Sequence, residues 1–111
     1  MGGDFGMSEW LAVGRVAEIP PERVRVFNVG DHEVAVANVE GEFYAIDDVC
    51  THDGGPLGQG ELEGAEIECP RHGARFDVRT GAATQLPAFE PVETHATRVE
   101  GDVVQVSVTH Q

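Results

Sequence analysis

The 111 residues of this chain, 11.9 kDa in all, provide one hydrophobic core, whereas two domains of that combined size would each be marginal. Seven arginines, no lysine and twenty acidic residues give a formal net charge of −13 at pH 7, which disfavours nucleic acid and anionic membranes as partners. No stretch approaches the ~18 apolar residues of a membrane span and no secretory leader is recognisable, so we expect a cytoplasmic protein.

The first residues carry little structural pattern. Residues 1–6 are rich in glycine, and Met7 looks like a second start of the chain. We therefore expect residues 1–6 to be a tag or a disordered terminus and residues 7–111 to form a single domain.

Short β-rich runs separated by turn residues predict an all-β fold, an antiparallel sandwich or barrel. The expected strands of its base cover residues 10–16, 23–29, 34–39, 43–47, 94–99 and 103–108. Hairpin turns are expected at Glu40-Gly41 and at residues 100–102. In the last strand Val104, Val106 and Val108 alternate with Gln105 and Ser107, which predicts one buried and one wet face.

The middle of the chain differs from both ends. Between residues 50 and 91, glycine, proline, cysteine and histidine leave room only for short strands, expected at 66–69 and 75–78. We interpret residues 48–91, approximately, as a lobe of loops inserted into the base, and loops held on a rigid sheet commonly carry functional sites.

Two cysteine–histidine pairs lie in this lobe. Cys50 and His52 are followed by Cys69 and His72, with the spacing C-x-H-x16-C-x2-H. Two cysteines are too few for a disulfide scaffold, and two thiolates with two imidazoles suit an iron–sulfur centre or zinc. A zinc site usually has at least two residues between its first ligands, so the first pair fits zinc poorly.

The motifs around these pairs resemble those of Rieske proteins. The resemblance covers residues 7–108 and is strongest in residues 50–57, CTHDGGPL, and 69–77, CPRHGARFD. It implies an antiparallel β-sandwich base with a cluster-binding lobe. It also implies a [2Fe–2S] cluster whose ligands are Cys50 and Cys69 on one iron and the Nδ1 atoms of His52 and His72 on the other.

The chain departs from the respiratory, high-potential members of that family. Those proteins have two further cysteines where this chain has Gly55 and Arg71, and hydroxyl residues where it has Ala74 and Phe76. Hydrogen bonds to the reduced cluster favour the added electron, so their absence lowers the reduction potential. We predict a value on the order of −150 mV, at the low end of the Rieske range.

An apolar rim is expected around the cluster. Residues 86–89, LPAF, resemble the third loop of the family, which covers the cluster, and Pro56 and Leu57 would extend it. Such a rim suits a small docking interface. The alternative is that Leu86 and Phe89 pack the interior of the lobe.

Several charged residues surround the motifs. Arg71, Arg75 and Arg79 are expected to pair with Asp53 or Asp77 or to contact a partner. The other three histidines have no cysteine beside them and are expected at the surface: His32, His95 and His110.

The resemblance is greatest to the ferredoxins of multicomponent dioxygenases. It implies a monomeric one-electron carrier, not an enzyme, that takes electrons from a flavin-dependent reductase and passes them to a Rieske non-haem iron oxygenase. Two alternatives remain: a Rieske-like small subunit of a complex such as assimilatory nitrite reductase, and a zinc-stabilised interaction module.

Overall fold

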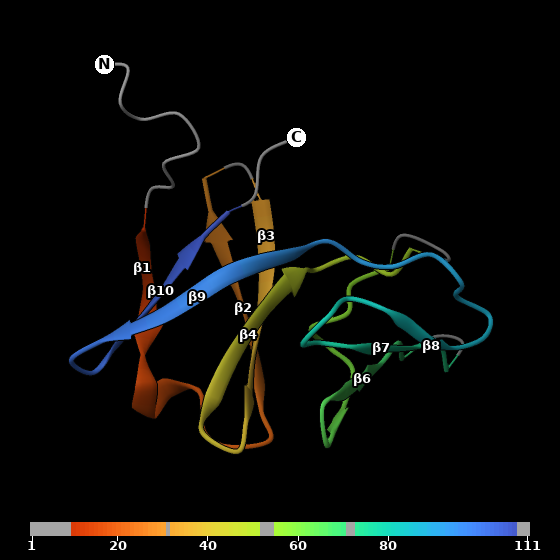
Figure 1. Ribbon diagram of the computed structural model, residues 1–111, viewed down its shortest axis with the longest axis horizontal. Coiled ribbons are helices and arrows are strands. Elements are labelled where there is room, and N and C mark those ends of the chain that lie inside the picture. The colour runs from red at the N-terminus through yellow and green to blue at the C-terminus, as the bar shows by residue number, and fades with distance from the viewer. Residues whose placement is uncertain (1–9, 31, 52–54, 71–72, 109–111) are drawn as a thin grey trace.

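Two antiparallel sheets from different parts of the sequence make up the protein (Figure 1). The computed structural model describes residues 10–30, 32–51, 55–70 and 73–108. Within these ranges there is no α-helix, and no helix is long and apolar enough to cross a membrane. The all-β prediction is therefore confirmed.

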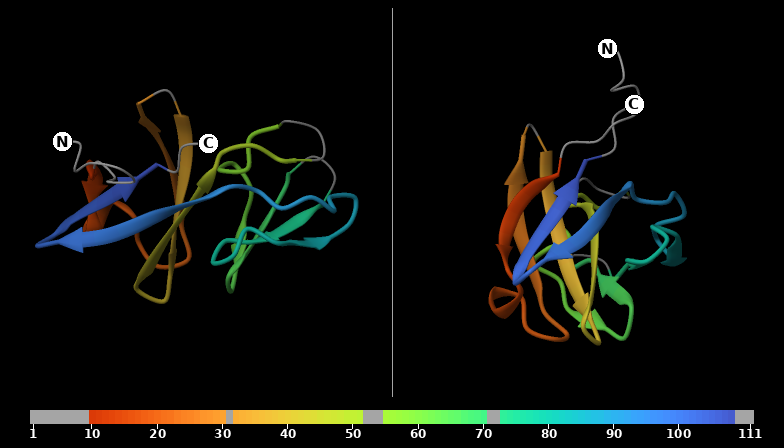
Figure 2. Two further views of the ribbon diagram at one scale, coloured as in Figure 1. Left: turned by 45° about the horizontal axis from the view of Figure 1, so that its top comes forward. Right: turned by 60° about the vertical axis from the view of Figure 1, so that its left-hand side comes forward.

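The base is a six-stranded sheet with the order β1-β10-β9-β4-β3-β2. The end strands β1 and β2 contact each other, so the sheet curls towards a barrel, as the two views of Figure 2 show. Its strands have the following bounds: β1 Leu11–Arg15, β2 Val24–Val29, β3 His32–Val39, β4 Glu42–Asp47, β9 Thr94–Glu100 and β10 Val103–Ser107.

The lobe is a four-stranded sheet with the order β5-β6-β7-β8. The chain leaves the base at the end of β4 and returns to it at the start of β9, and everything between belongs to the lobe or its connections. The lobe strands are only two or three residues long: β5 Leu62–Glu63, β6 Glu66–Glu68, β7 Arg75–Asp77 and β8 Ala83–Gln85.

Strand β3 forms a wall between two cores. Because successive side chains of a strand point to opposite faces, Val34 and Val36 enter the core of the base while Ala35 and Ala37 enter the core of the lobe. All four side chains are buried. The two small alanines leave room for the lobe to approach the sheet closely.

The hairpin between β3 and β4 has the expected two-residue turn. Glu40 and Gly41 have φ angles of 54° and 92°, and two positive φ values in succession match the right-handed twist of the flanking strands. Asn38 locks this end of the base from within: it donates to the Ile19 carbonyl at 2.7 Å and accepts from the Gly41 amide at 2.8 Å.

Most strand ends lie within one or two residues of the predicted ones. Strands β5 and β8 and the short 3₁₀ helix η2, Val16–Glu18, were not predicted, because two or three residues cannot show a periodic pattern.

Two further predictions have different outcomes. Ser107 is 3% exposed, so the predicted solvent-facing side of β10 is wrong at that residue. The division at residue 7 stays a prediction, because residues 1–9 lie outside the described residues.

Candidate metal centre

The two cysteines come together in the core of the lobe. Cys50 follows β4 and Cys69 follows β6 directly. Their exposed fractions are 0% and 1%, and neither forms a disulfide. Both belong to one apolar cluster, whose other buried members are Ala35, Ala37, Ile46, Leu57, Ile67, Ala74, Phe76, Val78, Ala88 and Val92. Two buried thiols in a dry environment suit a metal centre that prefers sulfur ligands.

Each cysteine begins a loop that closes in the same way. The Cys50 amide donates to the Gly55 carbonyl at 2.7 Å, and the Cys69 amide donates to the Ala74 carbonyl at 2.7 Å. In both loops the acceptor is five residues after the cysteine. Gly73, with φ of 78°, allows the second loop to turn back, and its amide donates to the Cys69 carbonyl at 3.1 Å. The two closures therefore present the thiols from equivalent positions of two turns.

The predicted nitrogen ligands, His52 and His72, lie outside the described residues, as do Asp53, Gly54 and Arg71. One chain neighbour of each histidine is described. Thr51 precedes His52 and Gly73 follows His72, and both lie in the loops that the cysteines begin, as the predicted cluster requires. The ligand set Cys50, His52, Cys69 and His72 stays a prediction.

A third segment contacts both loops. The Thr51 hydroxyl donates to the Glu90 carbonyl at 2.7 Å, and the Gln85 side-chain amide donates to the Gly73 carbonyl at 2.8 Å. Between these two contacts Ala88 is 3% exposed and belongs to the cluster that contains both cysteines. Thr51 and Gln85 were not predicted to have a role, because nothing in their spacing shows which backbone carbonyl each would reach.

The same segment exposes large apolar side chains. Leu86 and Phe89 are 72% and 79% exposed, so they do not pack the interior of the lobe. Pro56, in the first loop, is also exposed, whereas Leu57 is fully buried in the cysteine cluster. The prediction that Leu57 belongs to an exposed rim is therefore wrong.

Two of the residues that follow Cys69 have no hydroxyl group, Ala74 and Phe76. Ala74 and Phe76 are both fully buried in the cysteine cluster. Phe76 pairs with Ile67 across β6 and β7, and this pair fills the centre of the lobe. Neither side chain can donate a hydrogen bond to a buried anionic group.

Among the described residues, Arg75 pairs with glutamates and not with Asp77, while Asp53 lies outside the described residues. Its guanidinium meets the carboxylates of Glu63, Glu66 and Glu68 at 2.9, 3.5 and 3.3 Å. The Glu63 carboxylate holds the pKa of Arg75 above its usual range. These acids come from β5 and β6, so Arg75 fastens the first two lobe strands to β7.

Arg79 does pair with Asp77. The guanidinium reaches both carboxylate oxygens, at 3.1 and 3.0 Å, and the Arg79 backbone amide donates to the same side chain at 2.9 Å. The Arg79 side chain lowers the pKa of Asp77, and the backbone amide adds to the shift.

The prediction of surface histidines is wrong for His95. Its residue exposure is 7%, and its Nε2 lies 2.7 Å from Oδ1 of Asp47 across β4 and β9. His32 is half-buried, with its ring centroid 6.0 Å from that of His95. His110 lies outside the described residues. The contact with Asp47 was not predictable from the sequence, because the partners are 48 residues apart.

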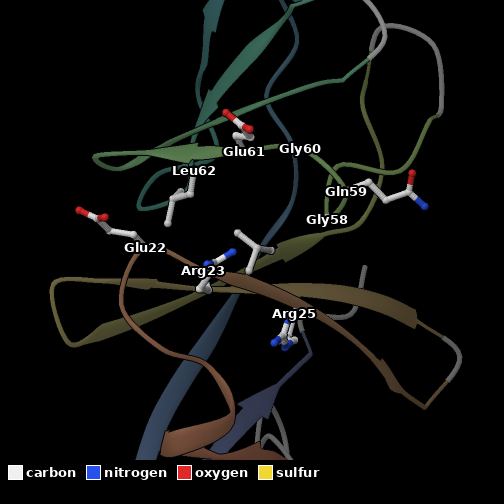
Figure 3. A pocket seen from close by; sticks show the side chains of 9 residues that line it. Glu22, Arg23, Arg25, Gly58, Gln59, Gly60, Glu61 and Leu62 are labelled. Carbon is white, nitrogen blue, oxygen red and sulfur yellow. The ribbon is translucent and has the colours of Figure 1, made fainter.

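A groove of about 390 Å³ separates the start of β2 from the lobe (Figure 3). Residues 22–25 line one side and residues 58–62 the other. Figure 3 shows the Arg23 side chain between the two sides, with the carboxylates of Glu22 and Glu61 pointing away from it. Neither cysteine lines this groove, so it is separate from the metal centre.

Comparison with known proteins identifies the cofactor of this chain. The model of the Rieske [2Fe-2S] domain family matches residues 9–96. The ferredoxin component of the naphthalene 1,2-dioxygenase system of Pseudomonas aeruginosa is 40% identical over 101 residues, which cover 91% of this chain and 97% of that protein.

Solved structures of ferredoxins from dioxygenase systems are also similar to this chain. The ferredoxin of carbazole 1,9a-dioxygenase from Nocardioides aromaticivorans IC177 matches with a TM-score of 0.88 and 36% identity, covering 92% of this chain and 100% of that one. A chain from a complex of reduced oxygenase and oxidised ferredoxin in carbazole 1,9a-dioxygenase matches with a TM-score of 0.84 and 37% identity, covering 88% and 92%.

The family match confirms the expected cofactor, a Rieske [2Fe–2S] cluster. The ferredoxin relatives confirm the electron-carrier hypothesis, and they favour it over the nitrite reductase subunit and the zinc module. The two buried thiols fit that cofactor by their chemistry and position. The chain therefore belongs to the Rieske [2Fe–2S] family, as a ferredoxin component that carries electrons and not as the catalytic subunit of a dioxygenase system.

Proposed function

We propose that this ferredoxin takes one electron at a time from a flavin-dependent reductase and passes it to a Rieske non-haem iron oxygenase. When bound, the [2Fe–2S] cluster accepts and releases that electron. The complex of oxygenase and ferredoxin in the carbazole system supports the second partner. The description of the naphthalene relative as one component of a system supports the first.

We assign the thiolates of Cys50 and Cys69 to one iron and the imidazoles of His52 and His72 to the other. The observation that carries this assignment is the burial of both thiols in one apolar cluster, each at the start of a loop closed in the same way. Burial excludes water from the thiolates, and the exposed segment beside them gives a partner access to this end of the lobe.

The docking face that we propose is the exposed apolar surface of residues 86–89 with Pro56. Electron-transfer partners use small interfaces, below about 1,200 Å², and two large side chains exposed by more than 70% suit such a contact. The charge of −13 would add salt-dependent steering towards a basic partner surface.

We also propose a low potential within the Rieske range. The side chains of Ala74 and Phe76 lie in the same apolar cluster as the thiols and offer no hydrogen bond to the added charge. Introducing hydroxyls at these two positions, with Ala74→Ser and Phe76→Tyr, should raise the potential by tens of millivolts in a redox titration.

Absorption and electron paramagnetic resonance spectra of the purified protein test the assignment. We expect a red-brown protein that bleaches with dithionite, with a reduced signal whose average g lies below that of a cluster with four cysteine ligands. Replacing His72 by Ser should change or abolish this signal. A wild-type spectrum in the His72→Ser variant would contradict the ligand assignment, and zinc without acid-labile sulfide would contradict the function.

A second measurement tests the docking face. In Leu86→Ser/Phe89→Ser, the rate of electron transfer to the partner oxygenase should fall while the spectrum and the potential stay as in the wild type. The control is Val26→Ser, which removes an apolar side chain that is 42% exposed on β2 of the base. An equal loss of rate in both variants would contradict a docking role for residues 86 and 89.

We further propose that the protein is cytoplasmic and monomeric. Two cysteines without a disulfide suit a reducing compartment. Elution at the mass of one chain from a sizing column is the expected result.

A further inference from the structure

The residues that adjoin the two predicted imidazole ligands are both tied to one short segment. Thr51 precedes His52, and its hydroxyl donates to the Glu90 carbonyl at 2.7 Å. Gly73 follows His72, and its carbonyl accepts from the Gln85 amide at 2.8 Å. The two contacts lie at opposite ends of residues 85–90.

We propose that residues 85–90 act as a brace that positions both histidine-bearing turns, with Thr51 and Gln85 as its positioning residues. This inference rests on the proposed function, because it concerns the imidazole side of the cluster. It assigns to the segment a role in holding the metal centre, in addition to the apolar side chains that it exposes.

The brace is itself held at three places. At its start, Gln85 pairs with Arg75 in the β7–β8 ladder. In its middle, Ala88 is buried among the residues that surround both cysteines. Just beyond its end, the Val92 amide donates to the Gly81 carbonyl at 2.8 Å. A segment fixed in this way can restrain the loops that it contacts.

The two contacts act inside the loops that the cysteines begin. The closures at Cys50 and Cys69 each join the amide of a cysteine to the carbonyl five residues further on. The Thr51 and Gln85 bonds act within those intervals, because Thr51 lies between Cys50 and Gly55 and Gly73 lies between Cys69 and Ala74.

The test compares variants with and without the donor group. Thr51→Val removes the hydroxyl and Thr51→Ser keeps it, while Gln85→Met removes the amide. Matched controls lie in the base: Thr97→Val, whose hydroxyl donates to the Phe43 carbonyl at 2.6 Å, and Gln105→Met, whose carbonyl accepts from Arg98 at 2.6 Å. Each control loses one side-chain hydrogen bond away from the lobe.

Cluster release is the first readout, followed on the holoprotein as bleaching of visible absorbance in excess chelator. We expect Thr51→Val and Gln85→Met each to bleach about two- to tenfold faster than wild type, the range for one lost hydrogen bond. Thr51→Ser and both controls should bleach at the wild-type rate. In the reduced state, only Thr51→Val and Gln85→Met should shift or broaden the paramagnetic resonance signal.

Wild-type bleaching in Thr51→Val and Gln85→Met would overturn the proposal, and so would equal acceleration in the base controls or no rescue by serine. Amide exchange of Cys69 and Gly73 in Gln85→Met separates this failure from failure of the proposed function. A colourless protein without sulfide would refute the function, yet faster exchange in Gln85→Met alone would still support the brace, and unchanged exchange would refute it.

Discussion

The two faces of β3 belong to cores that are built in different ways. Val34 and Val36 face the base, where strands of five to eight residues pair in long ladders around valine, isoleucine and phenylalanine. Ala35 and Ala37 face the lobe, where strands of two or three residues surround two thiols. The base can be stable through apolar burial alone, whereas the lobe has too little pairing for that and depends on its contacts and on the metal centre.

Removal of the cluster should produce the largest difference in stability between the lobe and the base. In protein stripped of iron, we expect amide exchange of Ile67 and Phe76 in the lobe to approach that of an unprotected chain. Val36 and Val104 in the base should keep most of their protection, because their core contains neither cysteine. Exchange followed residue by residue checks this expectation. Equal loss of protection in the base would show that the two cores unfold together.

The next largest loss of stability is expected from a substitution at Gly60, which lies against the residue before Cys69. A methyl group on Gly60 would overlap the backbone carbonyl of Glu68, the residue before Cys69, and neither backbone can yield easily. Gly60→Ala should therefore cost about 2–4 kcal/mol and reduce the yield of cluster-loaded protein.

The control for this change is Gly64→Ala. Gly64 has φ of 61° and nothing within 4 Å of an added methyl, so alanine there has only a conformational cost, about 1 kcal/mol. Thermal unfolding compares the two variants. Equal losses would mean that the contact with Glu68 relaxes without cost.

Neighbouring residues on β3 distinguish the two cores directly. Val36→Ala removes buried methyl groups from the base and should cost about 2 kcal/mol, with no change in the spectrum of the cluster. Ala35→Val overfills the cluster that contains both cysteines and should cost about 1–3 kcal/mol, with an altered spectrum. A spectral change in Val36→Ala would show that the wall between the cores transmits strain.

The same contrast explains what the sequence could predict. The base strands were predictable because valine-rich runs of five or more residues end at recognisable turns, and the cysteine pairs stood out by their spacing. Strands β5 and β8 were not, because they depend on pairing with β6 and β7 and not on their own residues.

The contacts between side chains were also not predictable from the sequence. The burial of His95 against Asp47 and the contacts of Arg75 with three glutamates join segments whose proximity only the folded chain establishes. In the same way, Leu57 was expected in the apolar rim and is buried, because the sequence could not show which way its side chain points. The cofactor was therefore easier to predict than the contacts that hold its loops.

The smallest expected effect concerns a turn of the lobe that a charge pair stabilises. The Arg79 side chain lowers the pKa of Asp77, so the stabilisation from this pair is complete above the ordinary aspartate value of about 3.9 and is lost as the pH falls through the lowered pKa. Arg79→Gln should lower the Tm at pH 7 by no more than a few degrees, because the guanidinium is largely exposed.

Arg15→Gln is the matched control in the base, since it removes the same charge from a pair that Arg15 forms with Asp102 at 3.1 Å, with both side chains about two-thirds exposed. Both variants change the net charge equally, so the difference between their Tm values measures the stabilisation that is specific to the Arg79–Asp77 pair. It should be present at pH 7 and should shrink below pH 4, because a protonated Asp77 no longer attracts the guanidinium. A difference that persists undiminished into acid would mean that Arg79 stabilises the lobe through packing and not through its charge.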